Sequence, residues 1–455
     1  MVEARRAEDA LIAVMERIRG SFARIQPWLT AAGYVRAVLS DLPKRNGWTI
    51  AEWIGHRSPD KVQRLLNKAS WDTDEVMRAV RGYVVTGLDA AAPTRSMRVG
   101  ALDETGQEKK GRATAGVKRQ HMGCADGVAN GINTVHLSYI RGGVGHALIG
   151  CRQWIPAEQL KDADIAARTG LPDGLRFATK GQLAAGIVRD AHADGVVFDF
   201  VCGDEVYGNS PDLRGYCESV GQGYVLRIPS NFTLTLGDGT ITTCKKIVKK
   251  HLKRKKRWQI VSAGDGDKGE RLYGWAWVAT GKPRHWLLIR KHLTTGELAY
   301  HLCFAPEGQP VTLKRLITAA GLRWPVEEDF EFGKDLFGLD QAQVRLYEAI
   351  RRHTVLVMIA LAVCSVTAAG ARPRTNTQAR PPTHPDDIPP VVPGHVPLTV
   401  AAIKNLLGAL NPRQATLEHR VHWQNWRDRH RARARWHHRR TRLRRPIENP
   451  YPQVK

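Results

Sequence analysis

Residues 196–208 read VVFDFVCGDEVYG, an apolar run that leads directly into an acid. The run 196–201 is typical of a buried strand, and Asp204 follows it in a polar turn. A helical pattern precedes this strand at residues 180–193, and a second helical pattern follows it at 211–220. A further apolar strand is predicted at 224–228. Strands that alternate with helices predict an α/β fold with parallel pairing in the sheet.

The same sheet is predicted to begin upstream with three strands. Residues 97–102 form a short apolar run that ends in Asp103, and residues 119–124 and 134–140 also have strand patterns. Three strands followed by helix, strand, helix and strand indicate a mixed sheet.

Downstream the alternation is interrupted by residues 229–283, which are rich in Thr, Gly, Lys and Trp and predict a β-rich insertion. Strand patterns resume at 286–290 and 298–304. Long helices are then predicted at 313–337, with a break near Gly321, and at 347–369.

The first ninety residues have helical periodicity throughout. Residues 49–52 (TIAE) predict a capping box, Gly55 a turn, and Ser58 the cap of a second helix. That second helix would present Lys61 and Arg64 outward. The layout is typical of a helix-turn-helix DNA reader, and a plain helical hairpin has the same layout.

We therefore expect five regions. They are a helical DNA-binding domain at 1–92, a catalytic core at 93–228 and 284–369, the insertion at 229–283, a flexible linker at 370–397 and a basic arm at 398–455. Eight of the 24 prolines lie in the linker, which has too few large apolar residues to form a core.

The charge of the chain is strongly positive, with 69 Lys and Arg against 44 Asp and Glu. Nine basic residues lie between 245 and 257, and eleven arginines lie between 420 and 445 with one acid among them. Such patches predict a polyanionic partner, either nucleic acid or an anionic membrane. The apolar run 354–369 is too short to span a bilayer, which favours nucleic acid. Seven scattered cysteines without a CxxC pair fit a reducing cytoplasm.

Acids at the ends of apolar strands are the first candidates for chemistry. Cleavage of a phosphodiester by two Mg²⁺ ions requires carboxylates from separate elements at one point. Asp103 and Asp204 have suitable positions, although either one alone is more simply a solvated acid that starts a turn. Their neighbours Glu104 and Glu205 are predicted to point to the opposite face of the sheet.

A third acid is sought in residues 321–334, GLRWPVEEDFEFGK. Pro325 suits the first turn of a helix, on which Glu327 and Lys334 would share one face with Arg323 just before it. On spacing alone, an ordinary salt-bridge face is favoured over a metal ligand flanked by phosphate-binding residues.

The spacing Arg323-x3-Glu327-x6-Lys334 resembles the latter part of the Tyr-x2-Arg-x3-Glu-x6-Lys signature of DDE-superfamily insertion-sequence transposases. The motif LDETG at 102–106 followed by KKG at 109–111 also resembles this group, in particular the insertion-sequence 701 family. One position departs from the signature, because Ala320 occupies the place of its tyrosine.

The resemblance implies a ribonuclease-H-like core in which Asp103, Asp204 and Glu327 are catalytic metal ligands for two Mg²⁺ or Mn²⁺ ions. It also implies that Arg323 and Lys334 contact DNA phosphates. The expected protein is a transposase that binds terminal inverted repeats, cleaves the transposon ends and joins the 3′-hydroxyls to target DNA. It would act as a homodimer on double-stranded DNA, without a membrane, in the nucleoid of a bacterial cytoplasm.

Further DNA contacts are predicted in the two basic patches. A basic and aromatic stretch in the insertion suits a strand-binding groove, although its tryptophans 258, 275 and 277 would equally form a small core. The arm is expected to bind phosphates, the alternative being a solvated tail. The predicted contacts are Lys249, Lys253, Arg254, Lys255, Trp258, Arg431, Arg433 and Arg435.

Two other functions remain open from the sequence. A structure-specific nuclease would share the core chemistry, and a repressor derived from a transposase would bind DNA without cutting it.

Overall fold

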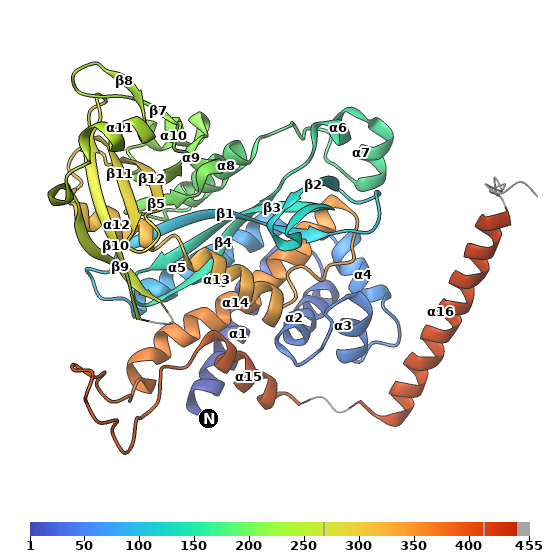
Figure 1. Ribbon diagram of the computed structural model, residues 1–455. Helices are drawn as coiled ribbons and strands as arrows, with labels where there is room; N and C mark the ends of the chain where they lie inside the picture. Colours follow the sequence, from blue (N-terminus) through green and yellow to red (C-terminus); the bar gives the residue numbers. More distant parts are fainter. Residues whose placement is uncertain (267–268, 413–414, 444–455) are drawn as a thin grey trace, which may run out of the picture.

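The computed structural model describes residues 1–266, 269–412 and 415–443. A large mixed sheet forms its centre, with helices packed on it (Figure 1). Ser138 on one face of the sheet contacts helix α13, whereas its neighbour Leu137 pairs with Gly150, which packs against Ile187 of helix α8. Because successive strand residues point to opposite faces, helices cover both faces. The predicted mixed α/β fold is confirmed.

The helices run in chain order from the N-terminus to the arm. They are α1 (Val2–Arg17), α2 (Ile25–Leu39), α3 (Gly47–Trp53), α4 (Asp60–Asn67), α5 (Thr73–Ala91), α6 (Ala157–Lys161), α7 (Ala163–Thr169), α8 (Lys180–Ala193), α9 (Glu205–Gly208), α10 (Pro211–Ser219), α11 (Cys244–His251), α12 (Leu313–Gly321), α13 (Pro325–Glu331), α14 (Tyr347–Thr375), α15 (Val400–Leu410) and α16 (Leu417–Leu443). Short 3-10 turns lie at Arg19–Ser21, Gly123–Ala125 and Lys255–Arg257, and a π-helix, η4, lies at Phe332–Leu336.

The strands are β1 (Arg98–Glu108), β2 (Lys118–Met122), β3 (Gly127–Arg141), β4 (Gly145–Gln153), β5 (Phe200–Gly203), β6 (Tyr224–Ile228), β7 (Thr233–Thr235), β8 (Ile241–Thr243), β9 (Gln259–Gly266), β10 (Gly269–Ala279), β11 (His285–His292) and β12 (Leu298–Phe304). The main sheet has the order β2-β3-β1-β5-β6-β12-β11-β10-β9, and β4 also pairs with β3. The β1–β5 and β5–β6 pairs are parallel, and the others are antiparallel.

Three details of the predicted strands are wrong. Strand β1 continues to Glu108, so Asp103 lies within it rather than at its end. Strand β5 begins at Phe200, later than the apolar run that indicated it. Strand β4 was not predicted, although it pairs with β3 through most of its length.

The predicted β-rich segment 229–283 contains a two-stranded hairpin, β7–β8, followed by helix α11 and strands β9 and β10. Strands β9 and β10 pair onward to β11 and β12 and so extend the main sheet. The later half of this segment is therefore continuous with the sheet that carries Asp103.

The predicted pair of short helices in the N-terminal region is present as α3 and α4, but the caps differ. Asn46 caps α3, because its side chain accepts hydrogen bonds from the backbone N–H groups of Trp48 and Thr49. Helix α4 begins at Asp60 with Pro59 before it, and the predicted cap residue Ser58 accepts a hydrogen bond from the backbone N–H of Asp60 at 3.4 Å. The turn between the helices contains Gly55 with φ of +85°, a conformation that favours glycine.

Helix α14 is the apolar core helix of the molecule. It has 29 residues, longer than the apolar run that indicated it, and by length and composition alone it could cross a membrane. The neighbouring elements bury 83% of its apolar stretch, among them α1, α5 and β4. A buried core helix passes the same test of length and composition.

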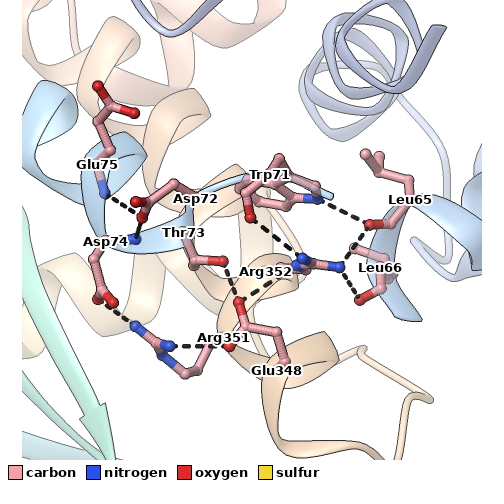
Figure 2. A network of polar contacts seen from close by, with 10 residues as sticks. All are labelled: Leu65, Leu66, Trp71, Asp72, Thr73, Asp74, Glu75, Glu348, Arg351 and Arg352. Carbon is pink, nitrogen blue, oxygen red and sulfur yellow. Dashed lines mark hydrogen bonds and ion pairs between the residues drawn. The ribbon is translucent and has the colours of Figure 1, made fainter. Parts of the chain in front are cut away.

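The first turns of α14 hold the N-terminal helices through a polar network (Figure 2). The Arg352 guanidinium stacks on Trp71 and donates to the backbone carbonyls of Leu65, Leu66 and Trp71. It thereby satisfies carbonyl groups at the end of α4 that lack partners within that helix. Glu348 and Arg351 bind the first residues of α5, Thr73 and Asp74. The network fixes α4 and α5 relative to the core.

The first half of helix α16 packs on the N-terminal helices. The Trp423 side chain is 0% exposed, and its indole N–H donates to the carbonyl of His56 at 2.9 Å. Trp426 packs edge-on against Trp48 of α3. The later half of α16 extends away from the body (Figure 1). Between α14 and α15, residues 376–399 contain no helix or strand.

Candidate active site

The parallel pairing of β1 with β5 places the first two acids side by side. Leu102 is paired with Gly203, the last residue of β5, and an aspartate follows each of them in the chain, Asp103 within β1 and Asp204 directly after β5. Asp103 accepts a hydrogen bond from the backbone N–H of Glu104 at 2.8 Å. Asp204 caps α9 by accepting from the N–H of Val206 at 2.9 Å. Both carboxylates are therefore oriented by backbone donors.

Burial and neighbouring carboxylates disfavour the ionised forms of both aspartates. Burial raises the pKa of Asp103 to about 7; the Arg323 guanidinium opposes this shift, and the Asp204 carboxylate adds to it. Burial and the neighbouring Glu104 carboxylate also raise the pKa of Asp204. A bound cation would relieve the repulsion and restore the charged forms.

Arg323 brings the third acid to the same point. Its Nη1 donates to Asp103 Oδ2 at 2.8 Å, and its Nη2 donates to Glu327 Oε1 at 2.5 Å. Arg323 lies in the break between α12 and α13, and Pro325 opens α13, as the sequence predicted. The guanidinium thus links acids that are 224 positions apart in the chain.

The next two acids of α13 face other partners. Glu328 pairs with His146 Nε2 at 3.2 Å, and Asp329 pairs with His146 Nδ1 at 2.9 Å. Burial lowers the pKa of His146, but the two carboxylates outweigh this effect and raise it to about 10. Of the three consecutive acids, Glu327 is the one that Arg323 joins to Asp103.

The neighbours of the aspartates are also engaged. Glu104 accepts hydrogen bonds from Lys180 Nζ at 2.5 Å and from the Tyr207 hydroxyl at 2.7 Å. Glu205 pairs with Arg227 at 3.1 Å. Neither Lys180 nor Tyr207 was predicted from the sequence to be a functional residue. The short distance of Tyr207 from Asp204 along the chain was the available signal.

The last residue of α9 is Gly208, and no side chain would fit at this position. A Cβ at this position would lie 1.7 Å from the carbonyl oxygen of Arg227 on β6. The close approach holds α9, and with it Asp204 at its N-terminus, against the sheet.

Lys334 does not share an α-helical face with Glu327 as expected. The π-helix η4 begins at Phe332 and changes the spacing, because its hydrogen bonds run from i to i+5. Lys334 lines a small cavity with Thr105 and His136, where burial and the Lys334 charge lower the pKa of His136 to about 3. His136 is paired with Asp103 in the β1–β3 register, so Lys334 lies near Asp103 through the cavity that it shares with His136.

The donor set at this site fits Mg²⁺ or Mn²⁺, because all three candidate ligands offer carboxylate oxygens. Within the described ranges, no three His, Cys, Asp or Glu side chains are gathered at coordinating positions. Arg323 occupies the space between Asp103 and Glu327. The site therefore has the ligand types for a divalent ion, with a guanidinium as the present counter-ion.

Two predicted DNA contacts line a basic cavity in the N-terminal region. Lys61 and Arg64 of α4 border a cavity of about 690 Å³ together with Arg24 and Lys68. Four cations around one cavity favour an anionic ligand.

The insertion forms a second basic groove. Lys249 and Lys253 border a space of about 420 Å³ between the β7–β8 hairpin and α11. Arg254 is exposed beside it, and the side chain of Lys255 lies outside the described residues. On the arm, Arg431, Arg433 and Arg435 are exposed on α16.

The tryptophans of the insertion differ in burial. Trp275 is buried in the core and donates to the carbonyl of Val261. Trp258 is half-buried, donates to the carbonyl of Leu252 and lies under the Lys291 ammonium. Trp277 is 38% exposed and stacks on Trp286. Trp275 therefore belongs to the core, and Trp277 keeps an accessible face.

Comparison with known proteins matches two overlapping parts of the chain to related families. The family described as DDE superfamily endonuclease matches residues 25–245, and the transposase DDE domain matches residues 178–363. The probable transposase for insertion sequence element IS701 of Microchaete diplosiphon is 26% identical over 194 residues, which are 42% of this chain. The match covers 47% of that relative, about half its length.

Among solved structures, a piggyBac transposase synaptic complex with hairpin DNA matches with a TM-score of 0.42 and 9% identity. The match covers 91% of this chain and 80% of that one. The family matches extend over all three acids, Asp103, Asp204 and Glu327. The chain matches the DDE superfamily endonuclease and transposase DDE domains over these ranges.

Proposed function

We propose that the protein is a DNA transposase that cuts the ends of its element and joins the freed 3′-hydroxyls to target DNA. The observation that carries this proposal is the arrangement of three carboxylates from separate elements around Arg323, whose charge interacts with all three. Asp103 and Asp204 are adjacent through the β1–β5 register, and Glu327 reaches Asp103 through Arg323.

In the proposed mechanism, Asp103, Asp204 and Glu327 would hold two divalent ions. Such ions would supply activation of the attacking oxygen and stabilisation of the leaving oxygen in an in-line displacement. The chain itself orients Asp103 and Asp204 through backbone donors and buries most of the Asp103 side chain, which is 17% exposed. The planar guanidinium of Arg323 matches a phosphate and is already at the site, so we assign it to a DNA phosphate.

We assign the core to the ribonuclease-H-like class. The run β4-β3-β1-β5-β6 within the sheet, with β1, β5 and β6 parallel, supports this assignment. The position of Asp103 within β1 and of Asp204 directly after the neighbouring strand β5 is in keeping with this assignment.

Double-stranded DNA is the proposed partner, bound at the terminal inverted repeats and at the target. The formal charge of +25 supports an electrostatic contribution to this binding, and the cavity beside α4 and the groove beside α11 supply local cation clusters. Coordinated cutting of two ends favours a homodimer on DNA. We place the protein in the bacterial nucleoid.

The test is cleavage of a DNA fragment bearing the element's ends in the presence of Mg²⁺. We expect Asp204→Ala and Glu327→Ala to abolish cutting while end binding is retained. Glu205→Ala and Glu331→Ala are matched controls, because each removes an acid next to or on the same helix as the residue tested. Near-wild-type cutting by Asp204→Ala or Glu327→Ala would refute the proposal.

The same assay separates the two alternatives. A structure-specific nuclease would hydrolyse DNA without joining 3′-hydroxyls to a second duplex. A silent repressor would bind the ends and leave them uncut.

A further inference from the structure

Asp329 is a buried acid beside the active site that the proposed metal ligation does not use. Its side chain is 0% exposed. One carboxylate oxygen pairs with His146 Nδ1 at 2.9 Å, and the other accepts a hydrogen bond from the Ser138 hydroxyl. A buried carboxylate is costly unless such partners satisfy it. We call Asp329, Ser138 and His146 the Asp329 clasp.

The clasp joins α13 to β3 through Ser138 and to β4 through His146, and β3 is paired with β1, the strand of Asp103. Ser138 is paired with Ala101 in the β1–β3 register, and His136 is paired with Asp103. The two pairs are two residues apart, a distance of about 7 Å along a strand. Phe330 of α13 packs edge-on against His136, with ring centroids 5.4 Å apart. Helix α13 therefore contacts strand β3 at two places, at His136, which is paired with Asp103, and at Ser138, two residues further along the strand.

The contacts of α13 with the sheet determine the orientation of the helix, because the helix is too short to hold a fixed orientation by itself. It has seven residues, begins at Pro325 after a break, and continues into a π-helix. So short a helix is marginal alone and takes its position from tertiary packing.

The rotation of α13 decides which of three consecutive acids faces Asp103. Successive residues are about 100° apart around an α-helix, so Asp329 and Glu327 point to nearly opposite sides. A turn of the helix by one residue would present Glu328 in place of Glu327. The clasp holds Asp329 on the β3–β4 side, which leaves Glu327 towards Arg323 and Asp103.

We propose that the Asp329 clasp is a positioning unit that fixes the rotation of α13 so that Glu327, rather than Glu328, completes the metal site. This inference rests on the proposed role of Glu327 as a metal ligand. Neither Asp329 nor Ser138 is a catalytic residue in it, because both act through Glu327.

The experiment measures Mn²⁺ binding to the full chain without DNA, by electron paramagnetic resonance, alongside the melting temperature. The variants are Ser138→Ala, which removes one hydrogen bond, and Asp329→Asn, which removes the charge. We expect the Mn²⁺ dissociation constant to rise at least fivefold in both at a temperature where they remain folded. Glu331→Gln, on the exposed side of the same helix, should bind Mn²⁺ as the wild type does.

A second control separates positioning from stability. Glu348→Gln weakens the network of Figure 2, which lies on α14 and α5, and should lower the melting temperature without changing Mn²⁺ affinity. If clasp variants likewise lose stability but keep wild-type affinity, the clasp is only structural and the inference is overturned.

The decisive comparison uses a Glu327→Ala background. Because the clasp acts through Glu327, Asp329→Asn should have no further effect on Mn²⁺ affinity there. An undiminished effect would overturn the inference. Clasp-dependent Mn²⁺ binding by a chain that does not cut DNA would refute the proposed function and support the clasp. A wild-type chain that binds no Mn²⁺ would overturn both.

Discussion

Metal binding should weaken sharply when the pH falls below neutrality, because Asp103 must lose its proton to become a ligand. Burial, with the help of Asp204, raises the pKa of Asp103 from 3.8 to about 7 in the metal-free protein. The carboxylate is thus mostly ionised at pH 8 and mostly protonated at pH 6. Since a metal ion binds the ionised form, affinity increases as the pH rises through about 7.

The size of the change in Mn²⁺ affinity follows from the raised pKa of Asp103. Each pH unit below the pKa costs about 1.4 kcal/mol, or tenfold in the binding constant. With a pKa near 7, the apparent Mn²⁺ dissociation constant should rise by roughly tenfold between pH 8 and pH 6. An aspartate with the ordinary pKa would remain ionised over this range and would give almost no change.

The assay is Mn²⁺ titration of the DNA-free chain at constant ionic strength, with Glu331→Gln as a control that should follow the wild type. In Asp103→Asn, the residual binding should lose most of its pH dependence. Equal wild-type affinities at pH 6 and pH 8 would refute the reasoning.

The stability of the metal-free fold should change in the opposite direction to the Mn²⁺ affinity as the pH rises. Its folded state binds the Asp103 proton more tightly than the unfolded state, so this residue destabilises the fold above about pH 7. That penalty decreases as the pH falls towards 3.8.

Three further predictions concern parts of the fold that support the site. Arg352→Met leaves backbone carbonyls at the end of α4 and at Trp71 without their donor and should lower stability by about 3 kcal/mol, and an unchanged calorimetric melting temperature would contradict this. Trp423→Ala should cost about 3–5 kcal/mol of docking energy and expose α16 to protease while the core stays resistant, so equal protection of α16 would count against the docked arrangement. Gly208→Ala forces α9 away from the carbonyl of Arg227 and should abolish Mn²⁺ binding, whereas Gly215→Ala, which meets nothing within 4 Å, should bind normally.

Much of the framework could be predicted locally. The apolar runs before Asp103 and Asp204 indicated two strands, and the helix between them indicated that the strands could pair in parallel. The break before Pro325 indicated the helix that carries Glu327. These predictions succeed because periodicity and turn residues act over a few positions.

Features that depend on distant partners were missed or left open. Nothing near Asp103 shows that β1 continues to Glu108, because its partner β3 supports the extension. The π-helix that moves Lys334 away from the expected face is equally invisible in residue spacing. The tryptophans at 275 and 277 have the same local pattern, and only the packed sheet decides that the first is buried and the second half-open.

The sequence by itself determined that acids of the right type follow two apolar runs and lie in a helix framed by Arg323. Helical spacing alone could not choose among Glu327, Glu328 and Asp329, because any of them can face the sheet in a helix of unknown rotation, and only the resemblance to the transposase signature favoured Glu327. The tertiary structure supplied the physical reason for that choice. Ser138 and His146, more than 180 positions away in the chain, hold Asp329 and thereby turn Glu327 towards Asp103. Such contacts fix a short helix in place, and no local pattern in the chain encodes them.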